Sequence, residues 1–168
     1  MAVRDVLEYP AEQLRAVAEP VATFDKQLSS LIADLSETLA AGTGIGLAAP
    51  QLGVPKRVLA LTDEQNPSAV RVFVNPEIIE VQTPCIVEER CLSLPGLVGR
   101  VFRYADARCR YQSETGEWCD DTLSGMPAVC LQHELEHLDG RLFLDRLSAF
   151  KRWRYHRVLR QGNADRAA

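Results

Sequence analysis

The clearest regular pattern in the chain lies between Phe24 and Ala41. Apolar residues recur there with the three- and four-residue spacing of one face of an α-helix. Thr23 or Asp25 is placed to cap the first turn, and Gly42 is placed to end the last turn. The pattern predicts an amphipathic helix whose buried face carries Leu28, Leu31, Ile32, Leu35 and Leu39.

A different pattern follows between Arg57 and Asp121, where short runs rich in β-branched residues are separated by Pro, Gly or Asn. The runs read RVLALT, VRVFVNP, EIIEVQ, GRVFR and ARCRYQS. Such punctuation is typical of antiparallel strands. The segment from Glu114 to Glu117 has the composition of a hairpin loop that leads into Trp118.

A second helix is expected to start near Ser124 or Gly125 and to end at Gly140, with Pro127 tolerated in its first turn. The predicted fold class is therefore α+β, with mainly antiparallel sheets, an N-terminal helix, a central helix and a C-terminal helix. The central helix has two apolar or functional stripes and should lie between a core and a site. One stripe holds Ala128, Leu131, Leu135 and Leu138, and the other holds Met126, Cys130, His133 and His137.

The composition is that of an ordinary globular protein, and the charge and hydrophobic pattern argue against DNA and membranes as partners. With 168 residues, 46% apolar and 25% charged, residues 1–168 are expected to form a single domain. A formal net charge of -4 gives no basic field for DNA. We expect a cytoplasmic protein without membrane contact, because the N-terminal residues lack a signal-peptide core and no apolar stretch is long enough to span a bilayer.

The five cysteines favour reduced thiols or metal ligands over a disulfide framework, because their number is odd and no export signal is seen. The most informative residues are His133, Glu134 and His137. Two histidines four residues apart on a helix project from one face about 6 Å apart, so both can reach one metal ion. Glu134 is placed to accept a proton from activated water without being a ligand.

A third ligand must come from elsewhere in the chain. Cys91 lies in a segment rich in turn formers, and its thiolate would complete a Cys/His/His site with a fourth position open to water, as in catalytic centres. Cys130 offers an alternative, because it precedes His133 by about one helical turn. A Cys91, Cys130, His133 and His137 set would instead close a structural zinc site.

Three segments together resemble the signature motifs of the peptide deformylase family, and they occur in the family's order. They are Gly44–Gln51 (GIGLAAPQ), Glu89–Gly96 (ERCLSLPG) and Gln132–Gly140 (QHELEHLDG). The similarity extends over nearly the whole chain. It implies a metal-dependent hydrolase that removes the N-formyl group from the N-terminal methionine of new polypeptides and releases formate.

The resemblance implies a role for each matching residue. Cys91, His133 and His137 would bind the metal, and Glu134 would be the general acid and base. The side-chain amide of Gln51 and the backbone N–H of Leu92 would stabilise the developing oxyanion.

The same resemblance implies how substrate is held. The backbone of Ile45 and Gly46 would pair with the substrate peptide as an added strand. Glu89 would form a supporting ion pair with Arg103. The methionine side chain would enter an apolar pocket, although the same residues could equally be ordinary core; the candidates are Ile45, Val87, Met126, Val129 and Cys130.

The sequence departs from the family pattern at three positions. Arg90 replaces a glycine, which could change peptide preference because a long cation then lies beside the substrate. Glu136 stands where the family usually has Asp, and we expect a small effect. Val98 stands where many members have an arginine that contacts substrate, so Arg90 or Arg100 could substitute.

One divalent ion is expected. A thiolate with two imidazoles suits zinc, iron, nickel or cobalt. The ligand types alone favour Zn²⁺, whereas the resemblance implies Fe²⁺ as the physiological ion, with Ni²⁺ and Co²⁺ as further possibilities.

The residues from about 149 to 168 form a tail that is basic although the protein as a whole is acidic. This tail has two interpretations. The tail could dock on the ribosome, where formyl-Met nascent peptides emerge. It could instead be a solvated helix that packs Phe150 and Trp153 on the body, which we favour. Its basic residues are Lys151, Arg152, Arg154, Arg157 and Arg160.

Two other functions compete with deformylation. A different metal-dependent amidase or peptidase could use the same helix motif. A structural zinc-binding module would hold metal without hydrolysing anything.

Overall fold

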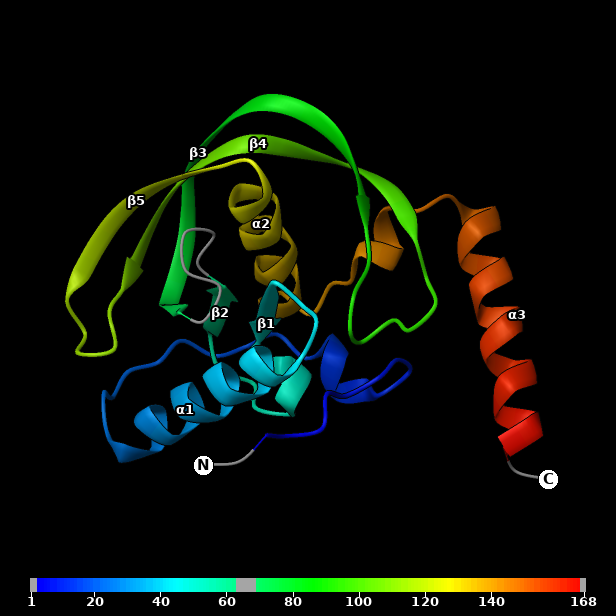
Figure 1. The fold of residues 1–168 in the computed structure, drawn as a ribbon, viewed down its shortest axis with the longest axis horizontal. Helices are drawn as coiled ribbons and strands as arrows, with labels where there is room; N and C mark the ends of the chain where they lie inside the picture. Colours follow the sequence, from blue (N-terminus) through cyan, green and yellow to red (C-terminus); the bar gives the residue numbers. More distant parts are fainter. Residues whose placement is uncertain (1–2, 63–68, 167–168) are drawn as a thin grey trace.

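The computed structural model describes residues 3–62 and 69–166, with side chains as far as residue 158. Its helices and strands confirm the predicted α+β class (Figure 1). Three α-helices and five strands occur in the described part, together with three short 3-10 helices. In chain order they are η1 (Glu12–Arg15), α1 (Lys26–Ala41), β1 (Gly46–Ala48), η2 (Ala49–Leu52), β2 (Val58–Thr62), β3 (Val70–Glu89), β4 (Gly99–Gln112), β5 (Trp118–Ser124), α2 (Met126–Leu138), η3 (Phe143–Arg146) and α3 (Ala149–Arg166).

The strands form one antiparallel sheet with the order β1-β2-β3-β4-β5. The short strand β1 is therefore an edge strand, and its pairing with β2 places Gly46 opposite Leu61. An edge strand presents backbone groups to a further strand on its open side. The predicted hairpin between β4 and β5 is confirmed, and the N–H of Ser113 donates to the carbonyl of Glu117 across 2.8 Å.

Strands β3 and β4 are longer than the sequence predicts, because runs that we expected to be separate join into one curved ribbon. Figure 1 shows this ribbon arching over α2. Asn75 and Thr83 take positive φ values of 50° and 58°, and the register shifts between Val74 and Glu77. Such irregularities bend a strand without ending its pairing. The Asn and Pro residues of β3 thus mark bends inside a strand and not its ends.

The predicted helix boundaries are confirmed to within about two residues. Asp25 Oδ1 accepts hydrogen bonds from the backbone N–H groups of Gln27 and Leu28 at 2.9 and 3.1 Å, and Gly42 follows the last turn of α1. Helix α2 begins directly after Gly125, and Gly140 takes a φ of 68° just beyond its end.

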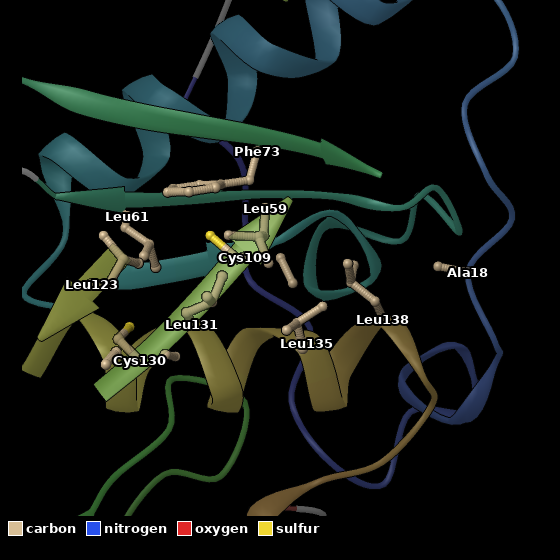
Figure 2. Packing of buried hydrophobic residues seen from close by; sticks show 13 residues of the cluster. Ala18, Leu59, Leu61, Phe73, Cys109, Leu123, Cys130, Leu131, Leu135 and Leu138 are labelled. Atoms are coloured by element: carbon tan, nitrogen blue, oxygen red, sulfur yellow. The ribbon is translucent and has the colours of Figure 1, made fainter. Parts of the chain in front are cut away.

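Helix α2 is buried on every side from Ala128 to Leu138, as its two stripes predict. One stripe packs on the sheet in the cluster shown in Figure 2, where Leu131 and Leu135 lie with Leu59, Phe73 and Cys109. Apolar burial of this kind contributes about 25 cal/mol per Å². The helix is therefore fixed firmly between the sheet and the residues that its other stripe presents.

The C-terminal helix α3 is attached through Tyr155, which is buried beside Leu14 and Leu94. The expectation that Phe150 and Trp153 pack on the body is wrong. Their side chains are 67% and 56% exposed, and their rings stack on each other at 6.1 Å because they share one outward face of the helix. No helix in the described part of the chain is long and apolar enough to cross a membrane.

Candidate metal centre

Three potential metal ligands from two parts of the chain meet at one point. The ligand atoms of Cys91, His133 and His137 all lie within 4.8 Å of one another. The thiol of Cys91 is 3.2 Å from Nε2 of His137, and the two histidine rings are 5.1 Å apart. One thiolate and two imidazoles are a donor set that binds a divalent transition metal with one position left open.

Cys91 reaches this point because β3 ends at Glu89 and the chain turns immediately afterwards. The carbonyl of Cys91 accepts from the N–H of Leu94 at 3.0 Å, and the carbonyl of Leu94 accepts from Leu97 at 3.1 Å. Cys91 therefore lies at the start of two consecutive turns, as the turn-rich sequence indicates. The metal-ligand group of the described residues does not include Cys130, whose Sγ lies 3.9 Å from Oε1 of Glu134.

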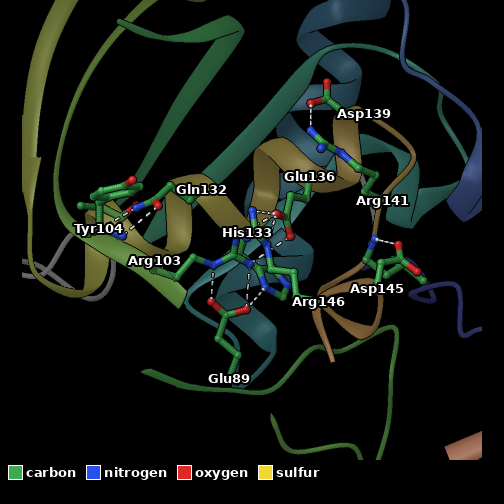
Figure 3. A network of polar contacts seen from close by, with 12 residues as sticks. Glu89, Arg103, Tyr104, Gln132, His133, Glu136, Asp139, Arg141, Asp145 and Arg146 are labelled. Carbon is green, nitrogen blue, oxygen red and sulfur yellow. Dashed lines mark hydrogen bonds and ion pairs between the residues drawn. The ribbon is translucent and has the colours of Figure 1, made fainter. Parts of the chain in front are cut away.

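A buried network of ion pairs contacts His133, one of the three potential ligands (Figure 3). Oε2 of Glu89 lies 2.8 Å from Nδ1 of His133, and both carboxylate oxygens of Glu89 accept from Arg103 at 2.6 and 3.0 Å. Arg103 also donates twice to Glu136, at 2.8 and 3.0 Å, and Glu136 accepts from Arg146. The predicted ion pair between Glu89 and Arg103 is confirmed. Because Nδ1 of His133 contacts Glu89, its Nε2 is left to face the other ligands.

The network fixes the charge of the groups around the ligands. Burial alone would raise the pKa of Glu89, but hydrogen bonds from His133 and Arg103 lower it to about 2. Burial would also lower the pKa of His133, yet its hydrogen bonds to Cys91 and Glu89 raise it. Burial lowers the pKa of His137, which keeps this imidazole in the neutral form that binds metals.

Glu134 lies beside the ligands but is not one of them. Its side chain is buried, and Oε2 has no hydrogen-bond partner among the described residues. Burial raises its pKa to about 7, which suits a group that both accepts and returns protons near neutral pH. Gly46 makes room for it: a Cβ atom at that position would lie 2.6 Å from Oε1 of Glu134 and 2.4 Å from Sγ of Cys130.

Gln51 is oriented by two hydrogen bonds. Its Oε1 accepts from the backbone N–H of Ala48 at 2.8 Å, and its Nε2 donates to Oγ of Ser93 at 3.2 Å. The same Nε2 lies 3.8 Å from Sγ of Cys91. The amide donor is therefore held beside the metal ligands, in a rotamer that the surrounding structure determines.

These groups open onto a cavity of about 250 Å³. Its apolar part includes Val129 and Cys130, which are buried, and Ile45 and Met126, which are 45% and 49% exposed. Cys130 also belongs to the hydrophobic cluster of Figure 2, so it contacts both the core and the cavity. The predicted site residues that line the cavity are Ile45, Gly46, Gln51, Glu89, Arg90, Cys91, Leu92, Met126, Val129, Cys130, His133 and Glu134.

Val87 is placed differently from the other pocket candidates. It does not line this cavity and packs against the cluster that contains Val101 and Leu144. The register of β3 with β4 pairs Val87 with Val101, a buried member of this cluster, so the side chain of Val87 is used in core packing.

The supporting roles of three residues are not predicted by the sequence analysis. Ser93 holds Gln51, and Glu136 and Arg146 complete the network around Arg103. No local pattern predicts these contacts, since they join residues between 10 and 42 positions apart. The motif Glu89–Gly96 does contain Ser93, which is the only sequence signal available for it.

Comparison with known proteins gives consistent matches over the whole fold. The profile of the family described as polypeptide deformylase matches residues 3–153. A peptide deformylase of Hahella chejuensis is 41% identical over 168 residues, covering 99% of this chain and 100% of that protein. One from Phenylobacterium zucineum is 44% identical over 155 residues, covering 90% of this chain and 92% of that protein.

Solved structures of peptide deformylases also match the fold of this chain. A crystal structure of a peptide deformylase from Legionella pneumophila superposes with a TM-score of 0.91 and 38% identity, covering 99% of this chain and 98% of that one. The peptide deformylase from Ehrlichia chaffeensis in complex with actinonin gives a TM-score of 0.89 and 32% identity, covering 96% of this chain and 98% of that one.

Proposed function

Because this chain belongs to the peptide deformylase family of metallo-hydrolases, we propose how its own residues divide the work of removing formyl from an N-terminal formyl-methionine. One observation carries the proposal. The buried carboxylate of Glu134 lies beside the group formed by Cys91, His133 and His137 without belonging to it.

Cys91, His133 and His137 hold the metal in this proposal. The donor set fits, because three ligand atoms converge and Glu89 orients the imidazole of His133. We propose Fe²⁺ as the physiological ion, while Zn²⁺, Ni²⁺ and Co²⁺ match the same ligands. When bound, the ion makes a water molecule acidic near neutral pH and polarises the substrate carbonyl.

Glu134 moves the protons. It takes a proton from the attacking water and gives one to the departing amine, so that formate and a free N-terminus result. Its buried position and raised pKa support this role, since a group poised near neutral pH exchanges protons in both directions. General acid–base catalysis of this kind typically contributes about 10²–10⁴ in rate.

Gln51 and Leu92 stabilise the oxyanion that develops on the formyl oxygen. The contacts of Gln51 with Ala48 and Ser93 aim its amide donor at the site. We assign the backbone N–H of Leu92 as the second donor, because Leu92 lines the same cavity directly after Cys91.

Substrate binding follows from the open edge of β1. The backbone at Ile45 and Gly46 lies along the cavity, so a peptide can add itself as a further strand. We place the methionine side chain against Met126, Val129 and Cys130, the apolar part of the cavity. Val87 is left out of this pocket because it faces the neighbouring core cluster.

The test of this division of roles is Glu134→Ala. The protein should fold and keep one metal ion per chain, because no ligand is changed, while turnover of a formyl-Met peptide falls by at least about 10²-fold. Glu114→Ala, in the exposed hairpin loop, is the matched control and should keep full activity. Normal turnover by Glu134→Ala would exclude the proposed proton-transfer role.

The partner of this enzyme is a formyl-Met nascent peptide, and cytoplasmic location and ribosome contact are parts of the proposal. The exposed rings of Phe150 and Trp153 support ribosome contact, together with Lys151, Arg154 and Arg157 on the same helix. The side chain of Arg160 lies outside the described residues. Trp153→Ala combined with Arg157→Ala should weaken co-sedimentation with ribosomes while leaving activity on short peptides unchanged.

A further inference from the structure

Arg90 is the one arginine or lysine among the described residues that line the cavity. Arg90 follows the buried Glu89 and precedes Cys91, yet its own side chain is 75% exposed. The turn after β3 points alternate residues in different directions, so Glu89 supports the metal ligands while Arg90 extends into solvent. Its charge therefore lies beside any peptide that enters the cavity.

The charge of Arg90 is only loosely compensated. Its Nη2 lies 3.6 Å from Oε1 of Glu88, which is longer than an ordinary hydrogen bond, and the Glu88 side chain is 60% exposed. Exposed ion pairs of this kind are weak because water screens them. A carboxylate on an incoming peptide can therefore compete with Glu88 for the guanidinium.

The position of Arg90 relative to β1 determines which part of a peptide it meets. Residues 45–46 and 88–92 all line the cavity, and the exposed side chains among them are those of Ile45, Glu88 and Arg90. In the proposed function the apolar pocket and the metal ligands take the formyl-methionine, so the residues that follow it must leave the cavity past these exposed side chains. Arg90 then lies beside those following residues.

We propose that Arg90 is a specificity-determining residue that favours substrates with an acidic side chain in the first two positions after the methionine. The proposal rests on the proposed function and adds a substrate preference to it. Arginine suits the task because its guanidinium binds a carboxylate through two parallel hydrogen bonds. Glu88 is the internal competitor that limits the preference.

Arg100 provides a matched control. It is also exposed and lies opposite Glu88 in the pairing of β3 with β4, but it is not among the residues that line the cavity. If any cation near Glu88 had the same effect, Arg100 would share the role. If the location at the cavity matters, Arg90 acts alone.

The experiment compares kcat/KM for formyl-Met peptides with an amidated C-terminus that differ at one position. Glu is compared with the neutral isostere Gln, first directly after Met and then one position later. The wild-type enzyme should prefer Glu over Gln by about two- to fivefold at one of these positions, the size expected for an exposed ion pair. The preference should shrink in high salt, because screening weakens such pairs.

The variants separate the proposal from its alternatives. Arg90→Ala should abolish the preference, Glu88→Gln should increase it, and Arg100→Ala should leave it unchanged. An unchanged preference in Arg90→Ala or in Glu88→Gln, or an equal loss in Arg100→Ala, would overturn the proposal. Because only ratios are compared, release of no formate from any peptide by wild-type enzyme would instead mean that the proposed function fails.

Discussion

Nδ1 of His133 lies 2.8 Å from the carboxylate of Glu89, and this contact sets the orientation of the imidazole. The ring can then present only Nε2 to Cys91 and His137. The carboxylate itself is held by Arg103, so the geometry of one ligand depends on a buried ion network behind it. This dependence leads to the first prediction.

Arg103→Met should destabilise the protein strongly. The side chain of Arg103 is 1% exposed and binds two buried carboxylates, Glu89 and Glu136, which the variant would leave without it. Breaking a buried pair in this way costs about 3–5 kcal/mol. The measurement is the free energy of unfolding in urea. Arg110→Met, which removes an exposed pair with Asp120, is the control and should cost at most about 1 kcal/mol.

Gln51→Leu should lower kcat by about 10²–10³, with a smaller change in KM, because in the proposed role its amide acts on charge that develops only in the transition state. The leucine fills similar space. The comparison is steady-state kinetics against Gln82→Leu, whose exposed side chain donates a hydrogen bond to Glu80. A rise in KM with kcat unchanged, or no change in either, would argue against the oxyanion role.

Gly46→Ala should impair catalysis because the new methyl group has no room. It would lie 2.4 Å from Sγ of Cys130 and 2.6 Å from Oε1 of Glu134, so the carboxylate must move. A displacement of about 1 Å can cost about 10²-fold in rate. Gly42→Ala is the control, since its Cβ would meet its nearest neighbour at 3.4 Å and its φ is negative. Equal activity of both variants would contradict the packing argument.

Removing the metal by chelation should abolish activity and leave the fold in place. Three clusters of buried apolar residues hold the sheet and helices together without using the ligands as their main contacts. Far-UV circular dichroism should therefore be nearly unchanged, and activity should return when Fe²⁺ or Co²⁺ is added. Unfolding on chelation would favour the structural zinc module, because such modules depend on the metal for folding.

The helices of this protein could be predicted because the causes of their ends are local. The carboxylate of Asp25 caps α1 two and three residues away, and Gly140 ends α2 by its positive φ. The length of β3 could not be predicted in this way. Asn75 and Thr83 bend that strand only because β4 continues to pair with it, which is a tertiary effect.

The residues of the site also differ in whether local sequence or tertiary packing determines their positions. His133 and His137 were evident because helical spacing brings them together, and Cys91 was evident because its motif is compact. The contact of Ser93 with Gln51, 42 residues away in sequence, and the contact of Arg146 with Glu136 depend on how distant segments pack. The placement of Val87 in the core, and the exposure of Phe150 and Trp153, likewise follow from packing that residue type does not determine.

Deformylation is tested most directly by measuring formate released from a short formyl-Met peptide by protein purified anaerobically with Fe²⁺, beside the N-acetyl analogue. We predict release of formate from the formyl peptide and no hydrolysis of the acetyl peptide. Equal hydrolysis of both, or cleavage of internal peptide bonds, would point to a different amidase or peptidase. No formate from folded, metal-loaded protein would contradict deformylation of formyl-Met peptides by this chain.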